Sequence, residues 1–295
     1  MQKKYPTLDE NLKNKIFSQY SLILIIIIGI SCLIRFYYFP TEIPLNADAL
    51  YYFWYSSDIY QIGALPNNWT PTNNGWPIFV SVFFTMLGLE NIFELMQIQR
   101  ILSVVISISI TIPVYFLCKK FVTRKLAIIG ASLIAFDPRL MINSFLGITD
   151  PLYLLLVSTG LTLFLSSNKK LVFCSFALIS LSTITRGEGI IFLIFLSILF
   201  FVRYRKEKYK IIFNYIIILI IILLIVMPMT IYRIDVNGND PIFTRSISSV
   251  NEIAVETSIN ENINFKIFEG LKNFAQFLIW IMIPNFIIFL PIGIF

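Results

Sequence analysis

Histidine is missing from this sequence of 295 residues. Its absence excludes a histidine general base, a Ser-His-Asp triad and zinc sites with histidine ligands. Charged residues are scarce as well, at 14% of the chain, whereas 57% of the residues are hydrophobic. A soluble domain of this length needs a far more polar surface. The chain is therefore predicted to be a polytopic membrane protein, and any chemistry must use carboxylates, arginine, lysine, tyrosine or backbone groups.

Cysteine is rare, and Cys32, Cys118 and Cys174 all lie in apolar segments, which argues against a disulfide framework. The net charge of +6 does not indicate a nucleic-acid partner. The cations cluster between apolar runs, where the positive-inside rule expects them. The N-terminal stretch MQKKYPTLDENLKNKIF is polar for too long to be a signal peptide. We expect residues 1–19 to form a cytoplasmic tail before a retained first span.

Apolar stretches recur along the chain, and a span must cross a hydrocarbon core of about 30 Å. We expect about eight spans, at 20–38, 98–118, 126–146, 151–167, 171–185, 190–202, 211–231 and 274–294. A shorter apolar piece at 76–89 is expected not to cross, because every basic loop then falls on the cytoplasmic side. Residues 41–97 would form one long outer loop with amphipathic helices at the membrane surface.

The predicted fold class is all-α, with a transmembrane domain over residues 20–295. The protein is expected in the cell membrane, with its N-terminus in the cytoplasm. The chain stops at LPIGIF without a closing charge. Two interpretations stay open: Phe295 ends a last span, or the chain is the N-terminal part of a longer protein.

Ionisable residues close to the bilayer are costly unless they face a cavity or a partner, so each is a candidate for function. Such residues gather at the turns expected on the outer side: Asp48, Asp150, Arg186, Glu188, Arg233 and Asp235. Each also has a structural explanation. Asp150 before Pro151 is typical of a helix N-terminus, which a carboxylate can cap. Arg186 can extend its charged end to the interface or be neutralised by Glu188, although on one helix these two would point to different faces.

The convergence of these residues at one membrane depth favours function. The carboxylates Asp48 and Asp150 can share a divalent cation such as Mg²⁺ or Mn²⁺, or one of them can take a proton. The arginines Arg186 and Arg233 can hold a phosphate near the lipid headgroups. The set predicts a pocket at the outer leaflet that recognises a lipid phosphate.

Six stretches follow one another in a distinctive order and spacing over most of residues 40–245: NADALYY, GLENIFELMQIQRILSVV, TIPVYFLCKKF, FLGITDPLYLLL, STITRGEGIIFL and MPMTIYRIDVNGNDPIF. This arrangement resembles the membrane glycosyltransferases of the GT-C superfamily. Within it, the chain is most similar to protein O-mannosyltransferases and aminoarabinose transferases, with some likeness to the catalytic subunit of oligosaccharyltransferases. The resemblance implies a GT-C-like fold and a polyprenyl-phosphate sugar, such as dolichyl-phosphate mannose, as donor.

The resemblance also implies roles for individual residues. Asp48 would be the general base or an acid associated with a metal ion, and Asp150 would contribute to the same site. Arg186 and Arg233, with Glu188 beside the first, would contact the donor phosphate.

Two departures from these relatives concern the metal. Asp48 is followed by Ala49, where the mannosyltransferases have a paired Asp-Glu, and Asp150 lacks the acidic pair of the oligosaccharyltransferases. These departures leave open whether Asp48 works with a divalent cation or alone. The long C-terminal region and soluble domain of many relatives are also missing, which leaves acceptor recognition open.

The resulting hypothesis is an inverting hexosyl- or pentosyltransferase. It would move a sugar from the lipid-linked donor to a hydroxyl or amide on a protein, lipid or glycan at the outer membrane face. Two alternatives remain: a secondary transporter or flippase for lipid-linked sugars, or an inactive scaffold with the same fold. Transporters tend to place charges at the midplane and to contain repeated halves, whereas here the acids lie at one face and no repeat is visible.

Overall fold

A computed structural model describes residues 10–45, 47–207, 209–240 and 270–276. The regular structure of these residues is helical throughout, which confirms the all-α expectation for this part of the chain. The chain divides into two compact units, Met1–Ile242 and Phe243–Phe295. In the second unit only the helical segment 270–276 is described, and the account below concerns the first unit.

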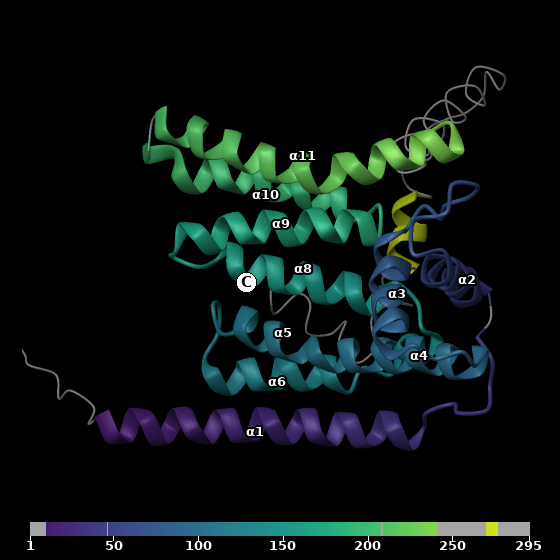
Figure 1. The fold of residues 1–295 in the computed structure, drawn as a ribbon. Helices are drawn as coiled ribbons and strands as arrows, with labels where there is room; N and C mark the ends of the chain where they lie inside the picture. Colours follow the sequence, from purple (N-terminus) through teal and green to yellow (C-terminus); the bar gives the residue numbers. More distant parts are fainter. Residues whose placement is uncertain (1–9, 46, 208, 241–269, 277–295) are drawn as a thin grey trace, which may run out of the picture. The chain divides into compact units, whose positions relative to one another are not determined.

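A stack of roughly parallel helices makes up most of the first unit (Figure 1). Its members are α1 (Glu10–Tyr37), α5 (Thr111–Cys118), α6 (Arg124–Ala135), α8 (Asp150–Phe164), α9 (Lys169–Thr185), α10 (Gly189–Tyr204) and α11 (Tyr209–Asn237), with a 3-10 turn at Arg205–Glu207 between the last two. Helix α9 packs against α8, α10 and α11. Between these helices a hydrophobic core forms around Phe176, Ile179, Leu196 and Phe200.

Fewer helices qualify as membrane spans by length and composition than the sequence suggests. Among the residues that the structure describes, three helical segments are long and apolar enough: Gln19–Tyr37, Ile92–Cys118 and Tyr209–Asn237. Helix α6 with α7 (Pro138–Leu146) adds a fourth if this pair, bent by 45°, counts as one span. Helices α8, α9 and α10 have 15, 17 and 16 residues. At 1.5 Å per residue they reach about 22–26 Å, short of the ~30 Å core. The expected span at 274–294 lies outside the described residues apart from its first turn.

Residues 41–97, expected to form one outer loop with amphipathic helices at the membrane surface, contain two helices and the start of a third. They are α2 (Ala47–Ile62), α3 (Gly75–Leu87) and the first turns of α4 (Ile92–Ser109). With 13 residues, α3 is about 20 Å long, too short to cross a membrane by itself. It is not simply a surface helix, because Trp76, Val80 and Phe84 are fully buried against α2 and α4.

A buried arginine fastens the start of this region to the helix stack. Arg100 of α4 donates hydrogen bonds to the backbone carbonyls of Pro40, Ile43 and Phe145 at 2.7–2.9 Å. Its neighbour Gln99 donates to the carbonyls of Ala49 and Gly147. Since the chain from Pro40 to Ala49 leads into α2, these contacts fix where α2 begins.

A second buried arginine secures the break between α6 and α7. Arg35 of α1 donates to the carbonyl of Ala135, the last residue of α6, at 2.9 Å, and Ser31 donates to the same carbonyl. Because Asp137 starts a new helix by accepting from the backbone N–H of Leu140, the end of α6 lacks a following turn to satisfy its carbonyls. The side chains of α1 satisfy one of them instead.

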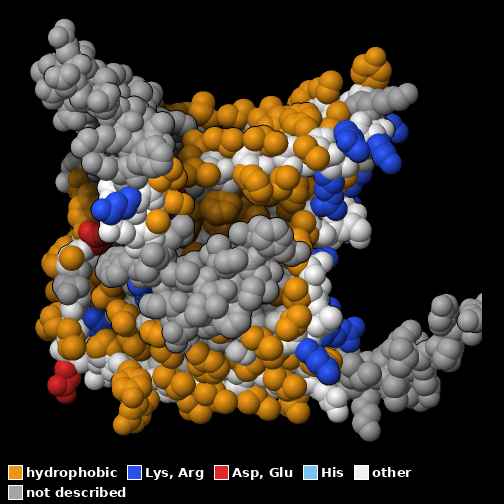
Figure 2. Space-filling view, turned by 180° about the vertical axis from the view of Figure 1, so that it is seen from behind, with side chains coloured by type: hydrophobic (Ala, Val, Ile, Leu, Met, Phe, Trp, Pro, Cys, Tyr) orange, Lys and Arg blue, Asp and Glu red, His pale blue; other side chains and the backbone are white. Residues whose placement is uncertain are grey.

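Lysine and arginine side chains concentrate at one end of the helix stack. Figure 2 shows a broad hydrophobic face with lysine and arginine gathered at one edge. The cations of the turns between α5 and α6, α8 and α9, and α10 and α11 account for this edge: Lys119, Lys120, Arg124, Lys125, Lys169, Lys170, Arg203, Arg205 and Lys206. An apolar belt with polar ends suits a protein that sits in a membrane.

The hydrogen bonds of Arg100 to backbone carbonyls lead to a prediction about stability. Replacing Arg100 with alanine strips several buried carbonyls of their donor, so the free energy of unfolding should fall by about 2–4 kcal/mol. The midpoint of thermal unfolding in detergent measures this loss, with the exposed Arg205→Ala as control. Equal midpoints for the two variants would contradict a clamping role for Arg100.

Candidate active site

Two of the predicted acids, Asp150 and Glu188, meet Arg186 at the end of the stack where α8 begins and α9 ends. Asp48 lies in the first turn of α2 and Asp150 in that of α8. Arg186 directly follows α9 with an extended backbone, and Glu188 directly precedes α10. This end of the stack is opposite to the cationic edge, because Lys169 and Arg186 lie at the two ends of the same helix.

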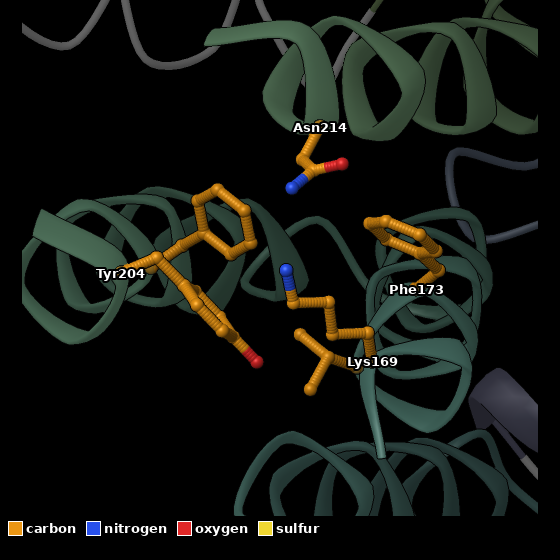
Figure 3. Close-up of a pocket in the computed structure, with 6 residues that line it drawn as sticks. Lys169, Phe173, Tyr204 and Asn214 are labelled. Carbon is orange, nitrogen blue, oxygen red and sulfur yellow. The ribbon is translucent and has the colours of Figure 1, made fainter. Parts of the chain in front are cut away.

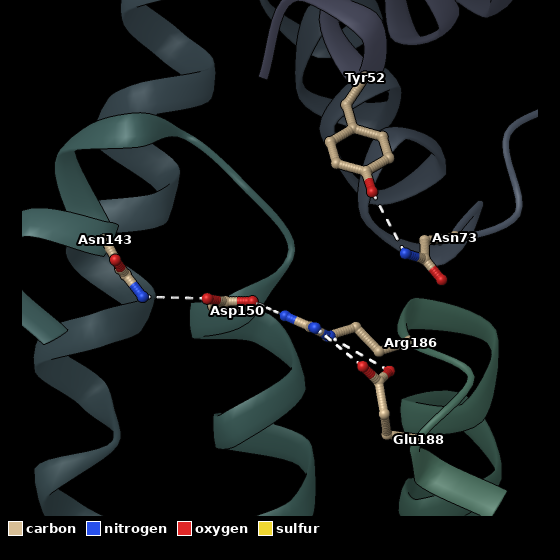
Figure 4. Close-up of polar contacts among 6 residues, drawn as sticks. All are labelled: Tyr52, Asn73, Asn143, Asp150, Arg186 and Glu188. Carbon is tan, nitrogen blue, oxygen red and sulfur yellow. Dashed lines mark hydrogen bonds and ion pairs between the residues drawn. The ribbon is translucent and has the colours of Figure 1, made fainter. Parts of the chain in front are cut away.

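Arg186 bridges two carboxylates (Figure 4). Its Nη1 forms an ion pair with Asp150 Oδ1. Its Nη2 and Nε donate to the two oxygens of Glu188 at 2.9 and 3.3 Å. Asn143 Nδ2 donates to the other oxygen of Asp150 at 3.0 Å, so both oxygens of Asp150 have partners. The guanidinium also lies 5.8 Å from the centroid of the Tyr153 ring.

The pairing of Arg186 with Glu188 differs from the expectation for two residues on one helix. Helix α9 ends at Thr185, and the following turn brings both side chains to the same side. Hydrogen bonds from Arg186 lower the pKa of Glu188 below its usual range, against a smaller opposing effect of burial. Arg186 and Asp150 are 31% and 20% exposed and Glu188 is 55% exposed, so Glu188 is the most accessible of the three.

Asp150 has a more specific role than that of a helix cap. Its backbone opens α8, but its carboxylate bonds to Asn143 and Arg186. Thr149, at the N-cap position, makes no side-chain capping bond either. The turn at 147–150 therefore serves to present a carboxylate to the end of α9.

Asp48 differs from Asp150 in being exposed and unpaired. Within the described part of the chain its carboxylate makes no hydrogen bond or ion pair. Ala47, just before it, has a φ of +44°, a left-handed conformation that alanine rarely adopts and that is common at functional sites. The carboxylate is thus placed at the exposed start of α2, directly after this left-handed residue.

Tyr52 connects Asp48 with the Arg186 cluster. Burial raises the pKa of Tyr52, the hydrogen bond from Asn73 lowers it, and the charges of Asp48 and Arg186 shift it in opposite directions. Asn73 Nδ2 lies 3.2 Å from the Tyr52 hydroxyl (Figure 4). Asp48 and Arg186 are therefore both within electrostatic range of one phenol.

Arg233 is near this site but has no surface for a ligand. It is fully buried at the end of α11 and forms an ion pair with Asp240 at 3.0 Å. Its Nη1 donates to the carbonyl of Thr72 and to Asn74 Oδ1 at 3.0 and 2.9 Å. The geometry assigns Arg233 to holding the loop that contains Asn73, and direct contact with a phosphate, as the sequence suggested, would require this loop to open.

An apolar groove of about 440 Å³ starts beside the Arg186 cluster. Its walls come from α3, α8, α9 and α11, and the lining residues are Gly75, Ile78, Phe79, Val82, Leu152, Leu156, Leu181, Ile184, Thr185 and Met229. Thr185 is adjacent to Arg186, and Leu152 follows Asp150 by two positions. At Gly75 a Cβ atom would lie 2.6 Å from the Thr185 hydroxyl oxygen, so only glycine lets α3 approach α9 this closely.

The expected sharing of a divalent cation by Asp48 and Asp150 stays a prediction. Both oxygens of Asp150 are engaged by Asn143 and Arg186, so an ion would have to displace the guanidinium. Among the described residues no three Asp, Glu or Cys side chains come together. We derive no step through a metal ion.

A second pocket lies at the cationic end of the stack (Figure 3). Lys169, Phe173, Tyr204 and Asn214 line it, and the Lys169 ammonium lies 5.5 Å from the centroid of the Tyr204 ring. The pocket leaves no room for even a water molecule. It is a packed junction of α9, α10 and α11, and a substrate site there would need rearrangement.

Sequence reasoning missed four polar or aromatic members of the site: Tyr52, Asn73, Asn143 and Tyr153. They contact the site from separate elements, and no local motif distinguishes them from other tyrosines and asparagines.

No known family, curated protein or solved structure matches this chain. The site's own chemistry is therefore the basis for assigning function.

The Arg186 cluster generates a prediction about pH. The pKa of Glu188 lies below its ordinary 4.5 in the folded protein, so the ion pair stabilises the fold above that value and is lost as the pH falls through the lowered pKa. Replacing Glu188 with glutamine should flatten this part of the acid stability profile, measured as thermal midpoints in detergent. The exposed Glu90→Gln should keep the wild-type profile; the same profile in all three proteins would contradict the assignment.

Proposed function

We propose that the protein is a membrane glycosyltransferase that uses a polyprenyl-phosphate sugar as donor and a hydroxyl or amide of a protein, lipid or glycan as acceptor. The observation that carries this proposal is the charged cluster at the start of an apolar groove. A donor of this class has an anionic phosphate between a sugar and a long hydrocarbon chain. The phosphate needs a cation and the chain needs an apolar surface, and both occur here side by side.

Arg186 is the proposed phosphate ligand. A guanidinium binds phosphate oxygens with two parallel hydrogen bonds. In the structure the Nε and Nη2 edge of Arg186 makes such a pair with Glu188. Because Glu188 is more than half exposed, it can give way to the incoming phosphate while Asp150 keeps hold of Nη1. Glu188 therefore acts as a placeholder for the donor phosphate.

Asp48 is the proposed general base. Its carboxylate takes the proton from the acceptor hydroxyl as that oxygen forms a bond to the anomeric carbon. The bond between the anomeric carbon and the phosphate oxygen breaks, and the lipid phosphate leaves with the electron pair, which inverts the anomeric configuration. Arg186 stabilises the charge on the departing phosphate from a fixed position. Arg233 contributes indirectly, by positioning the loop of Asn73.

The proposal includes a GT-C-like, eight-span topology with a cytoplasmic N-terminus and this site at the outer face of the cell membrane. The sorting of cations to the opposite end of the stack supports that orientation. A flippase for the same lipid would use the same groove and cluster without needing Asp48. The two functions therefore differ in whether sugar is transferred.

Removing the base tests the transferase proposal. Asp48→Asn should lower the rate of sugar transfer about 10²–10⁴-fold, the usual contribution of a general base, with little effect on donor binding. The assay follows labelled sugar from a panel of polyprenyl-phosphate donors in proteoliposomes that contain acceptor glycans, lipids or peptides. Glu90→Gln, at an exposed carboxylate between α3 and α4, is the control. Unchanged transfer by Asp48→Asn would remove Asp48 as the base, and lipid movement without transfer would favour the flippase.

If Glu188 occupies the place of the donor phosphate, replacing Glu188 and replacing Arg186 should change the affinity for polyprenyl phosphate in opposite directions. Glu188→Gln removes a competitor for Arg186 and should tighten binding of polyprenyl phosphate several-fold, whereas Arg186→Gln should weaken it at least tenfold. Titration of the labelled lipid into protein in nanodiscs measures both. Weaker binding by Glu188→Gln would show that Glu188 supports the ligand directly.

A further inference from the structure

An aromatic platform lies on α2 next to Asp48. Tyr51 and Tyr55 are three and seven residues after Asp48, so all three side chains share one face of the helix. Trp69, from the loop between α2 and α3, packs against both tyrosines, with ring centroids 5.2 and 5.0 Å apart. Tyr51 is 47% exposed and Trp69 is half-buried, so the platform is open to a ligand.

The orientation of Trp69 is fixed by the protein. Its indole N–H donates to Asp58 Oδ2 at 2.8 Å, and the ring of Tyr55 packs against it at an interplanar angle of 81°. Tyr55 is itself fully buried and lies within hydrogen-bond distance of the hydroxyls of Tyr232 and Thr70. A tryptophan that anchors a membrane protein usually directs its polar edge to the headgroup region. Here that edge is used internally, which leaves the rings in a preorganised arrangement.

We infer that Tyr51 and Trp69 form a subsite that binds the ring of a pyranose beside Asp48. The inference rests on the proposed function and extends it. Sugar rings present apolar C–H faces that pack on aromatic rings, and rigid aromatic side chains lose little entropy when they bind. Because Tyr51 is three residues after Asp48 on the same helix, a sugar on this platform would lie beside the carboxylate of Asp48. The platform therefore sets which sugars are accepted.

The chain offers a matched control for this subsite. Trp54 is also an aromatic residue of α2 and is 47% exposed, equal to Tyr51, but its only aromatic partner in the described structure is Phe53. Tyr51→Ala and Trp54→Ala therefore remove similar exposed aromatic surface from the same helix. A general loss of membrane anchoring would affect both variants alike.

The experiment compares binding of bare polyprenyl phosphate and of polyprenyl-phosphate mannose, glucose and arabinose by wild-type protein and the two variants in nanodiscs. In wild-type protein, the sugar should strengthen binding about tenfold for at least one donor, which corresponds to about 1.4 kcal/mol. Tyr51→Ala should lose this gain and keep its affinity for bare lipid phosphate, whereas Trp54→Ala should keep both.

A second arm adds methyl pyranosides of the same sugars and detects contact by saturation-transfer NMR. A signal that Tyr51→Ala abolishes, with donor binding unchanged, places the acceptor's sugar on the platform instead of the donor's. If bare lipid phosphate fails to bind while the methyl pyranosides bind through Tyr51, the proposed function fails and the subsite stands. Equal behaviour of wild-type protein and Tyr51→Ala in both arms overturns the subsite.

Discussion

The structure depends on buried arginine side chains, each of which must find oxygen atoms that accept its hydrogen bonds. Such acceptors have to come mainly from the backbone and from neutral side chains, because only 14% of the residues are charged. A buried cation without partners costs several kcal/mol, so its position specifies where acceptors must converge. Arg35 donates a hydrogen bond to the last carbonyl of α6, and Arg100 donates to carbonyls of the residues before α2. Arg233 donates to a carbonyl in the loop before α3. Arg35 thereby joins α1 to α6, Arg100 joins α4 to the residues before α2, and Arg233 joins α11 to the loop before α3.

Arg186 differs from these three arginines in its partners and its exposure. It binds two carboxylates where the buried arginines mainly bind neutral oxygens, and one of these carboxylates is mostly exposed. An arrangement of this kind can exchange one anion for another without exposing a buried charge. The lining of the apolar groove includes Thr185, next to Arg186, and the aromatic platform lies on α2 next to Asp48. A cation, an apolar surface and an aromatic surface are what the proposed donor would need for its phosphate, its hydrocarbon chain and its sugar ring.

Several features were predictable from the residues alone because they depend on local composition. Long apolar runs predict α1, the helix over Ile92–Cys118 and α11, and Asp150 before Pro151 marks the start of α8. Other features were not predictable. The pairing of Arg186 with Glu188 depends on α9 ending at Thr185. If both residues lay on one continuous helix, as the sequence analysis assumed, their side chains would point to different faces. The burial of Arg233 depends on Thr72 and Asn74, some 160 positions away.

The sequence by itself determined the class of protein and the available chemistry: a helical, apolar chain without histidine, in which carboxylates and arginines must act. Hydropathy and residue type are local properties, so they can be read from the chain directly. Only the tertiary structure decided which charges meet. It brought Asp150, Arg186 and Glu188 together, left Asp48 exposed, and buried Arg233 with Asp240. Whether an ionisable side chain binds a ligand or the protein depends on packing between distant segments, which no short stretch of sequence encodes.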